Sequence, residues 1–315
     1  MKSLKFVSVL VSLALMATTV QAQESGTLKK IKDTGTITLG VRDSSIPFSF
    51  LDDKQNYQGY SIDLCLKAVT SIQKHLGLTS LNVKLNPVTS ATRIPLMANG
   101  TIDLECGSTS NNMERQKQVS FAPTTFVTAT RIVSKKTSHI KGLADLKGKT
   151  VVCTAGGAAH KQLSSLNLEQ GLGITIVAGK DISESFLMVE TGRAVAFLMD
   201  DILLASLVAN TKSPADYEIS KEALSVEPYG IMMRKDDPAF KAVVDKAIST
   251  VLSSGDINRI YNKWFLQAIP PKGISLNWPM SEQFKAVLAK PTDSGEPSTY
   301  AAVPEAQKIL LKKKI

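Results

Sequence analysis

Three segments near the start of the chain decide the fold: TITLGV (residues 36–41), YSIDLCLKAVTSIQK (residues 60–74) and LNVKLNPV (residues 81–88). The first alternates as a strand does, and the second places its apolar side chains at helical spacing, with Ser61 as the expected N-cap. The third is a strand, after which a helix at about 91–99 ends at Gly100 before a short strand at 102–104. This βαβ order predicts a mainly parallel sheet covered by helices on both faces.

The same alternation begins again near residue 150. The predicted strands are TVVC (150–153), a segment near 174–178 and AVAFLM (194–199), with helices from about 158 and over 184–191. Because a chain of this length exceeds a single ordinary core, we expect a second α/β lobe.

The chain after the second lobe changes character. Asp237-Pro238 opens an amphipathic helix, and a further helix carries Trp264. Residues 276–315 have a partly linker-like composition, with a short helix near 281–289 and no obvious core face. We assign no function to the basic tail at 301–315.

The first 22 residues are typical of a cleavable signal peptide. Lys2 and Lys5 precede an apolar run at 6–16, and Val20-Gln21-Ala22 offers small residues for cleavage near Ala22. The alternative is a membrane anchor, but the run is shorter than the ~20 residues that a spanning helix needs. No cysteine follows the run, so a lipid anchor is not indicated. We expect an exported periplasmic protein.

The formal net charge of +9 does not indicate a nucleic-acid partner, because the lysines are spread along the chain and are not interleaved with aromatic residues. The three cysteines are too few for a disulfide framework. Since Cys65 lies in a helical pattern and Cys153 in an apolar strand, buried thiols are the favoured interpretation, and one bridge with one free thiol is the alternative. The histidines show no metal-ligand spacing, so no metal or cofactor is predicted.

A cluster of cationic and hydroxyl side chains lies in TSATRIPLMANGTIDLECGSTSNNMERQK (residues 89–117). Arg93 and Arg115 each offer a planar fork of donors that grips a carboxylate in two places, and Ser108 and Ser110 supply further hydrogen bonds. Arg42 follows the strand at 36–41 and is expected at the same edge of the sheet. The cluster predicts a small anionic ligand, and the additional arginines suggest that the ligand carries a second acidic group.

Two features of the predicted second lobe are expected to face this cluster. Asp200 ends a buried strand, where an acid can pair with the ammonium of an amino acid, and its alternative role is to cap the next helix. Gly156-Gly157-Ala158 begins a helix without the pattern of a phosphate loop, so we expect its backbone to meet a carboxylate. No Ser-His-Asp, HExxH or CxxC arrangement argues for catalysis.

The sequence resembles the periplasmic solute-binding proteins of polar amino-acid ABC transporters, closest to those for glutamate and aspartate. The resemblance runs from about 26 to 290 and rests on these segments: GTLKKIKDTGTITLGVRDSSIPFSFLD, QGYSIDL, TSATRIPLMANGTIDLECGSTSNNMERQKQVSF, LADLKGKTVV, ETGRAVAFLMDD, RKDDPAFK and YNKWFLQAIPPK.

The resemblance implies a two-lobed periplasmic-binding-protein fold of type II. Lobe one is expected to comprise residues 26–130 and 227–275, and lobe two residues 131–226. The lobes are expected to be joined by a two-strand hinge near 128–133 and 226–230, and to close on L-glutamate or L-aspartate. The implied protein is a monomer that docks on membrane permease subunits.

The resemblance also implies a role for each candidate residue. Arg115, with Ser108 and Ser110, matches the positions that hold the α-carboxylate, and Asp200 matches the partner of the α-ammonium. The family positions that hold the side-chain carboxylate of the ligand are matched by Arg42, Ser90 and Arg93.

Two departures from the family pattern lie in lobe two. Where relatives have a threonine hydroxyl in the turn at 155–158, this chain has Gly157 and Ala158 with backbone donors alone, and Ile182 replaces a histidine. Each lost contact is worth roughly 1–3 kcal/mol when its partner is charged, so binding is expected to weaken or shift to another ligand. His160 is a candidate for compensation, and a surface role is the favoured alternative.

Two other function classes stay open at this point. An exported enzyme on the same fold, of the cyclic-acid dehydratase kind, would use Glu105 or His160 as its acid or base. A sensory receptor for an amino acid is the second alternative, and the sequence does not separate sensing from transport.

Overall fold

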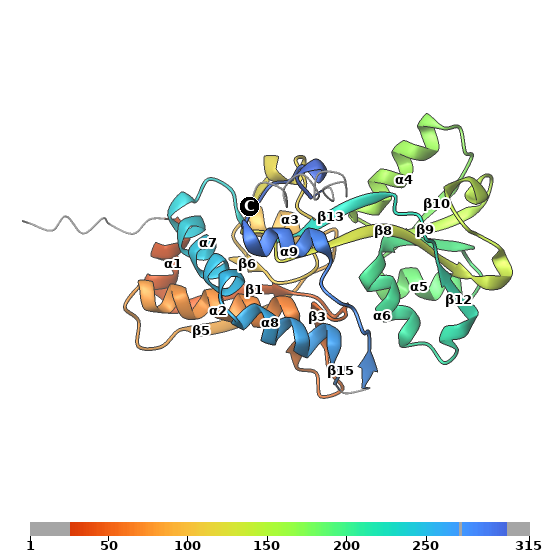
Figure 1. The fold of residues 1–315 in the computed structure, drawn as a ribbon. Coiled ribbons are helices and arrows are strands. Elements are labelled where there is room, and N and C mark those ends of the chain that lie inside the picture. The colour runs from red at the N-terminus through yellow and green to blue at the C-terminus, as the bar shows by residue number, and fades with distance from the viewer. Residues whose placement is uncertain (1–25, 271–272, 301–315) are drawn as a thin grey trace, which may run out of the picture.

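Two mixed sheets, each flanked by helices, organise the chain into two lobes (Figure 1). The structure is a computed structural model that describes residues 26–270 and 273–300. The expected signal peptide at 1–22 and the basic tail at 301–315 lie outside the described residues. None of the helices in the described ranges is long and apolar enough to cross a membrane.

The first sheet has the strand order β5-β1-β6-β14-β7. Its strands are β1 (Thr36–Val41), β5 (Asn82–Pro87), β6 (Leu104–Glu105), β7 (Val119–Phe121) and β14 (Met232–Arg234). The strands β5, β1 and β6 are parallel, as the βαβ pattern predicts, whereas β14 and β7 are antiparallel to their neighbours. The helices associated with this sheet are α1 (Gly26–Thr34), α2 (Tyr60–His75), α3 (Arg93–Ala98), α7 (Pro238–Ser253) and α8 (Asp256–Tyr261). The return of the chain through β14 makes this lobe discontinuous in sequence.

The second sheet has the order β10-β9-β11-β8-β12, with β13 also paired to β8. Its parallel part consists of β9 (Thr150–Thr154), β10 (Thr175–Gly179) and β11 (Ala196–Asp200). The helices are α4 (Ala158–Glu169), α5 (Ile182–Glu190) and α6 (Asp201–Ala209). The sheet is completed by β8 (Phe126–Lys135), β12 (Tyr217–Ile219) and β13 (Ser225–Tyr229), where β12 and β13 pair with different halves of β8.

The strands β8 and β13 run between the lobes (Figure 1). They pair antiparallel from Ser225 opposite Thr130 to Tyr229 opposite Phe126. At the end near the first lobe, the N–H of Thr125 donates to the carbonyl of Tyr229 at 2.8 Å. The residues predicted to form the crossings, 128–133 and 226–230, belong to these two strands except for Gly230, which follows β13.

Two small antiparallel sheets lie outside the main ones. The first comprises β2 (Ser44–Ser45), β3 (Ser49–Leu51) and β4 (Tyr57–Gln58), and the second comprises β15 (Ala268–Ile269) and β16 (Ile274–Ser275).

The described part of the C-terminal extension has a core face, so the prediction that it has none is wrong. Helix α9 (Glu282–Ala289) buries Phe284 and Val287. The ring of Phe284 lies 6.0 Å from the ring of Tyr261 and 6.1 Å from that of Phe126. A helix of only two turns carries too few apolar positions for its periodicity to stand out.

Two further predictions are corrected by the structure. Gly59, not Ser61, is the N-cap of α2, and its φ of 145° suits glycine. The hydroxyl of Ser61 instead donates to the carbonyl of Gly107 at 2.7 Å. The favoured interpretation of buried thiols is wrong for Cys65, which forms a disulfide with Cys106, and is confirmed for Cys153, which is a free, buried thiol; the alternative of one bridge and one free thiol is the one that the structure has.

Candidate functional site

Three arginines of the first lobe are buried together near the carboxyl ends of its parallel strands. Arg42 directly follows β1, Arg93 is the first residue of α3, and Arg115 begins a short 3-10 turn. Their exposed fractions are 2%, 3% and 7%. In a sheet of this type ligands collect outside the carboxyl ends of the strands, so the sequence prediction of a shared edge is met by the placement of these residues.

The hydrogen bonds of the arginines leave part of their donor capacity unused. An Nη2 of Arg42 donates to Ser90 Oγ at 3.1 Å, and Nη1 of Arg115 donates to the carbonyl of Ser110 at 2.8 Å. Within the described residues, Nε and Nη1 of Arg93 and the hydroxyl oxygen of Ser108 are buried without a hydrogen-bond partner. Buried polar groups of this kind are costly unless a partner meets them, so the cluster is suited to an anion.

The arginines are close enough to act on one another electrostatically. Burial, followed by the charge of Arg93, lowers the pKa of both Arg42 and Arg115 to about 10. Burial also lowers the pKa of Arg93, and the carboxylate of Glu105 opposes this change. The cause shared by all three is burial away from water, and for Arg42 and Arg115 the positive charge of Arg93 adds to it. An anion bound there would relieve it.

Glu105 is a component of the site whose role sequence reasoning missed, because it entered only as a possible acid or base. It is fully buried at the end of β6, and its Oε2 accepts a hydrogen bond from the hydroxyl of Thr109 at 2.5 Å. Its charge acts on all three arginines. Glu105 therefore offsets part of the positive charge from within the protein.

Asp200 lies at the end of β11 in the second lobe, as predicted, and is 3% exposed. It accepts a hydrogen bond from the hydroxyl of Tyr229 and makes no side-chain cap bond to α6. Burial, and next the charge of Glu227, raises its pKa to about 7. The carboxylate is thus available to a cation and is poorly stabilised without one.

Asp201, the first residue of α6, makes local hydrogen bonds with both oxygens of its side chain. One of its oxygens accepts from the N–H of Ile202 at 2.8 Å and from the hydroxyl of Thr128 at 2.5 Å. The other accepts from Nε of Arg131 at 3.1 Å. The bonds with Thr128 and Arg131 hold the start of α6 against strand β8.

The turn before α4 approaches the arginine cluster from the second lobe. Nη2 of Arg115 donates to the carbonyl of Gly156 at 3.2 Å. A Cβ at Gly156, where φ is +72°, would lie 2.6 Å from Cα of Ala91, so this close approach requires glycine. The N–H of Gly157, expected to face a carboxylate, donates instead to the carbonyl of Thr154 at 2.9 Å. Ala158 is the first residue of the helix.

The position of Ile182 explains why an apolar residue is accommodated there. It begins α5, is 1% exposed and belongs to the main hydrophobic core. The adjacent Asp181 caps the helix by accepting from the N–H of Glu184 at 2.9 Å. Its negative charge opposes the lowering of the Arg42 pKa that burial causes. Asp181 is therefore a charged group of the second lobe that acts on the site, and the sequence did not single it out.

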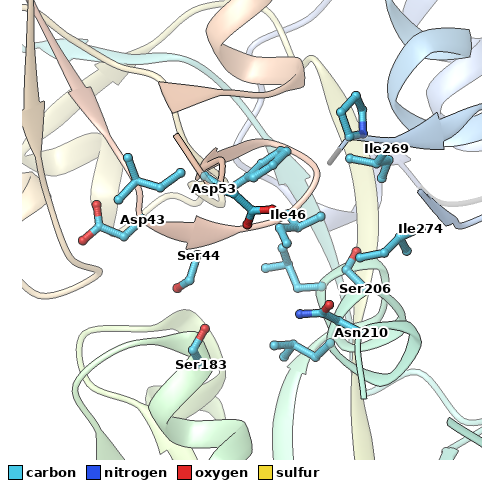
Figure 2. A pocket seen from close by; sticks show the side chains of 14 residues that line it. Asp43, Ser44, Ile46, Asp53, Ser183, Ser206, Asn210, Ile269 and Ile274 are labelled. Carbon is cyan, nitrogen blue, oxygen red and sulfur yellow. The ribbon is translucent and has the colours of Figure 1, made fainter. Parts of the chain in front are cut away.

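Two hollows flank the cluster between the lobes. A groove of about 670 Å³ is lined by Arg115, the turn at 156–158, His160 and Glu227. A smaller cavity of about 200 Å³ lies between the first-lobe loop that follows Arg42 and helices α5 and α6. Figure 2 shows Asp43 and Ser44 on one side of it, with Ser183 and Asn210 on the other. The arginine cluster thus lies at the junction of the two lobes.

Sequence reasoning also missed Tyr229, whose hydroxyl reaches Asp200 from β13. Its ring is buried beside Phe48, with a centroid distance of 5.1 Å. The predicted crossing at 226–230 included this residue, but the pairing of β13 with β8 is needed to see that its side chain enters the site.

Comparison with known proteins gives consistent matches. Residues 37–267 match the model of the bacterial extracellular solute-binding proteins, family 3. The chain is 55% identical over 282 residues to the L-glutamate/L-aspartate-binding protein of Pseudomonas aeruginosa, covering 89% of this chain and 93% of that one. It is 45% identical over 289 residues to the glutamate/aspartate import solute-binding protein of Escherichia coli, covering 90% and 96%.

Among solved structures, a mutant of the arginine-binding protein ArgBP from T. maritima is similar, with a TM-score of 0.67 and 28% identity over 75% of this chain and 98% of that chain. The likeness extends over both lobes, which confirms the type II fold that the sequence predicted.

Proposed function

Because this chain belongs to the bacterial extracellular solute-binding proteins of family 3, we propose that it is the binding component of an ABC importer for L-glutamate and/or L-aspartate. The observation that carries the proposal is the placement of three buried arginines in one lobe and the buried carboxylate of Asp200 in the other. This arrangement matches a molecule with two carboxylates and one ammonium.

The charges of the buried groups support an acidic amino acid. Among the buried groups of the site, three arginines, Arg42, Arg93 and Arg115, stand against two carboxyl groups, those of Glu105 and Asp200, so positive charge is in excess. Glutamate and aspartate each carry a net charge of about −1 at neutral pH. Since an uncompensated buried charge is costly, a ligand of this charge is favoured over a neutral or cationic amino acid.

The proposed roles follow the geometry of the site. Arg115, with Ser108 and Ser110, holds the α-carboxylate, and Asp200 receives the α-ammonium. The side-chain carboxylate lies against Arg93, whose Nε and Nη1 have no partner in the described chain, with Arg42 and Ser90 beside it. Ala158 and Ile182 add no side-chain hydrogen bond to the ligand.

We further propose that residues 26–130 with 227–275 and residues 131–226 move as two bodies about β8 and β13. Closure brings Asp200 to the arginines, and the closed monomer then docks on permease subunits in the periplasm. The enzyme alternative is set aside, because relatives at 45–55% identity are solute-binding proteins.

A thermal-shift screen of the ligand-stripped protein against the twenty amino acids tests the ligand class. We expect L-glutamate and L-aspartate to give the largest increases in melting temperature, since a ligand that binds only the folded state stabilises it. Stimulation of ATP hydrolysis by the genetically adjacent permease complex in proteoliposomes tests the transport role. Binding without stimulation would favour a sensory receptor.

A further inference from the structure

The last described part of the chain, residues 276–300, contacts the turn that carries Arg115 and the segment before β8, and is called the C-terminal strap. It lies beyond residue 267, where the family match ends, and contains α9 and a 3-10 turn at Pro297–Tyr300. In Figure 1 its helix α9 lies beside α7 and β8. The strap is therefore placed against the hinge and against the lobe that carries the arginines.

The first contact of the strap is with the turn that carries Arg115. The carbonyl of Asp293 accepts from Nδ2 of Asn111 at 2.8 Å and from Nε2 of Gln116 at 2.9 Å. A Cβ at Gly295 would lie 2.8 Å from the carbonyl carbon of Asn112, so the backbones of the strap and the turn are in close contact. The strap therefore contacts residues that precede Arg115 in the sequence and the residue that follows it.

The second contact is with the start of the hinge. The N–H of Thr124 donates to the carbonyl of Thr292 at 2.8 Å. The hydroxyl of Tyr300 lies 2.7 Å from Oγ1 of Thr124 and donates to the carbonyl of Ser294 at 2.7 Å. Thr124 lies two residues before β8, and the 3-10 turn at Pro297–Tyr300 packs against β13. Both hinge strands therefore touch the strap.

Asn111 connects these contacts. It is fully buried, and its backbone N–H donates to the carbonyl of Pro228 in β13 at 2.7 Å. Its Oδ1 accepts from Nε2 of Gln116 at 2.8 Å, while its Nδ2 donates to the strap. The backbone and side chain of this one residue thus join the strap, the hinge and the turn of Arg115.

The strap is itself anchored on the first lobe. The carboxylate of Asp293 pairs with Nζ of Lys241 on α7 at 2.9 Å, and the same Nζ donates to the carbonyl of Phe121 at 2.9 Å. The rings of Phe284 and Tyr261 stack in the core. The strap is therefore anchored on the first lobe as well as on the two strands that join the lobes.

We propose that the C-terminal strap is a positioning element for ligand binding, which acts by holding Arg115 and the first residues of the hinge in the geometry that grips the ligand. The inference rests on the proposed function of Arg115 as a ligand-holding residue. The guanidinium of Arg115 donates to the carbonyls of Ser110 and Gly156, whereas the strap bonds to neighbouring residues of the turn that carries Arg115. A side chain placed in this way loses little entropy when the ligand arrives.

A double-mutant cycle tests the proposal. The full chain, a chain that ends after Lys290, Arg115→Lys and the combination are titrated calorimetrically with the amino acid that binds the wild-type protein best. Because the cycle uses that ligand whatever it is, failure of the strap proposal is distinguishable from failure of the glutamate/aspartate assignment. Lys285→Ala, which removes an exposed ion pair on α9, is the control and is expected to leave affinity unchanged.

We expect the shortened chain to bind at least tenfold more weakly than the full chain, and to lose less than threefold when Arg115 is already lysine. Equal losses in both backgrounds, or no loss in either, would overturn the proposal. If the shortened chain does not fold, the double variant Gln116→Leu, Tyr300→Phe takes its place, since it removes a donor to Asp293 and the hydroxyl at Thr124 while the chain stays whole. For this double variant too, equal losses of affinity in both backgrounds, or no loss in either, would overturn the proposal.

Discussion

The hydroxyl of Tyr229 donates a hydrogen bond to the carboxylate of Asp200 and thereby joins the hinge strand β13 to the end of β11. Both residues are buried, and the bond lowers the pKa of Asp200 against the effect of burial. The proposed hinge therefore contributes directly to the charge state of Asp200, the residue that we propose receives the ligand's ammonium.

Tyr229→Phe is expected to weaken glutamate binding three- to tenfold at pH 7, because the ionised form of Asp200 loses one hydrogen bond worth about 1 kcal/mol. The phenyl ring keeps its packing against Phe48. Tyr57→Phe is the matched control, since its hydroxyl donates to Asp43 outside the arginine cluster. Equal affinities of the wild type and Tyr229→Phe by calorimetry would contradict this role.

Ligand affinity is expected to increase with pH up to about 7 and then level off. The pKa of Asp200 without ligand is raised from 3.8 to about 7, and pairing with an ammonium requires the ionised form. Binding therefore releases a proton from Asp200 at pH 6. Calorimetry in buffers of different ionisation enthalpy measures this release, and a pH-independent affinity between 5 and 8 would exclude it.

The same raised pKa predicts the pH dependence of stability. The folded ligand-free protein holds a proton on Asp200 more tightly than the unfolded chain, so its free energy of unfolding falls as the pH rises from about 4 to about 7. Asp200→Asn removes this cost, which is at most about 4 kcal/mol at about 1.4 kcal/mol per pKa unit. Urea unfolding should show Asp200→Asn to be more stable than the wild type at pH 8 and similar to it at pH 4. The reverse order would show that Asp200 is paired within the protein.

Arg93→Ala is expected to reduce glutamate affinity at least 100-fold and glutamine affinity less than tenfold. The loss of a charged partner for a buried carboxylate costs about 2–5 kcal/mol, whereas a neutral carboxamide loses less. Arg193→Ala, at an exposed position, is the control. Similar losses for both ligands would show that Arg93 has a structural role.

The disulfide between Cys65 and Cys106 is expected to stabilise the site-bearing lobe by about 4 kcal/mol, from the separation of 41 residues. The double variant Cys65→Ser, Cys106→Ser should lose this amount in urea unfolding, and Cys153→Ser should serve as the control for the free thiol. Burial raises the pKa of Cys153 to about 12, so the native wild type should react slowly with thiol reagents. Rapid reaction would mean that a thiol is accessible.

The sequence was most informative where a local pattern determines the structure. The period of two in 36–41 and the helical spacing in 60–74 predict β1 and α2 because each pattern depends on one buried face. Arg42 and Asp200 could be placed because each lies at the carboxyl end of a parallel strand, where ligands collect in sheets of this type.

The sequence failed where tertiary contacts decide the outcome. The partner of Cys106 is on a helix 41 residues earlier, and the role of Tyr229 depends on how β13 crosses between the lobes. The core face of α9 depends on a pocket formed by aromatic rings of distant segments. The N-cap of α2 is set by the close approach of Gly59 to Phe48, which no local signal reports.

The most direct test of the account is a calorimetric comparison of L-glutamate with L-glutamine on the ligand-stripped protein at pH 7.5. The two ligands differ only in the group that is expected to meet Arg93, Arg42 and Ser90. We predict one binding site with at least 100-fold higher affinity for glutamate. Equal affinities, or tighter binding of glutamine, would contradict the assignment of these buried arginines to a second carboxylate.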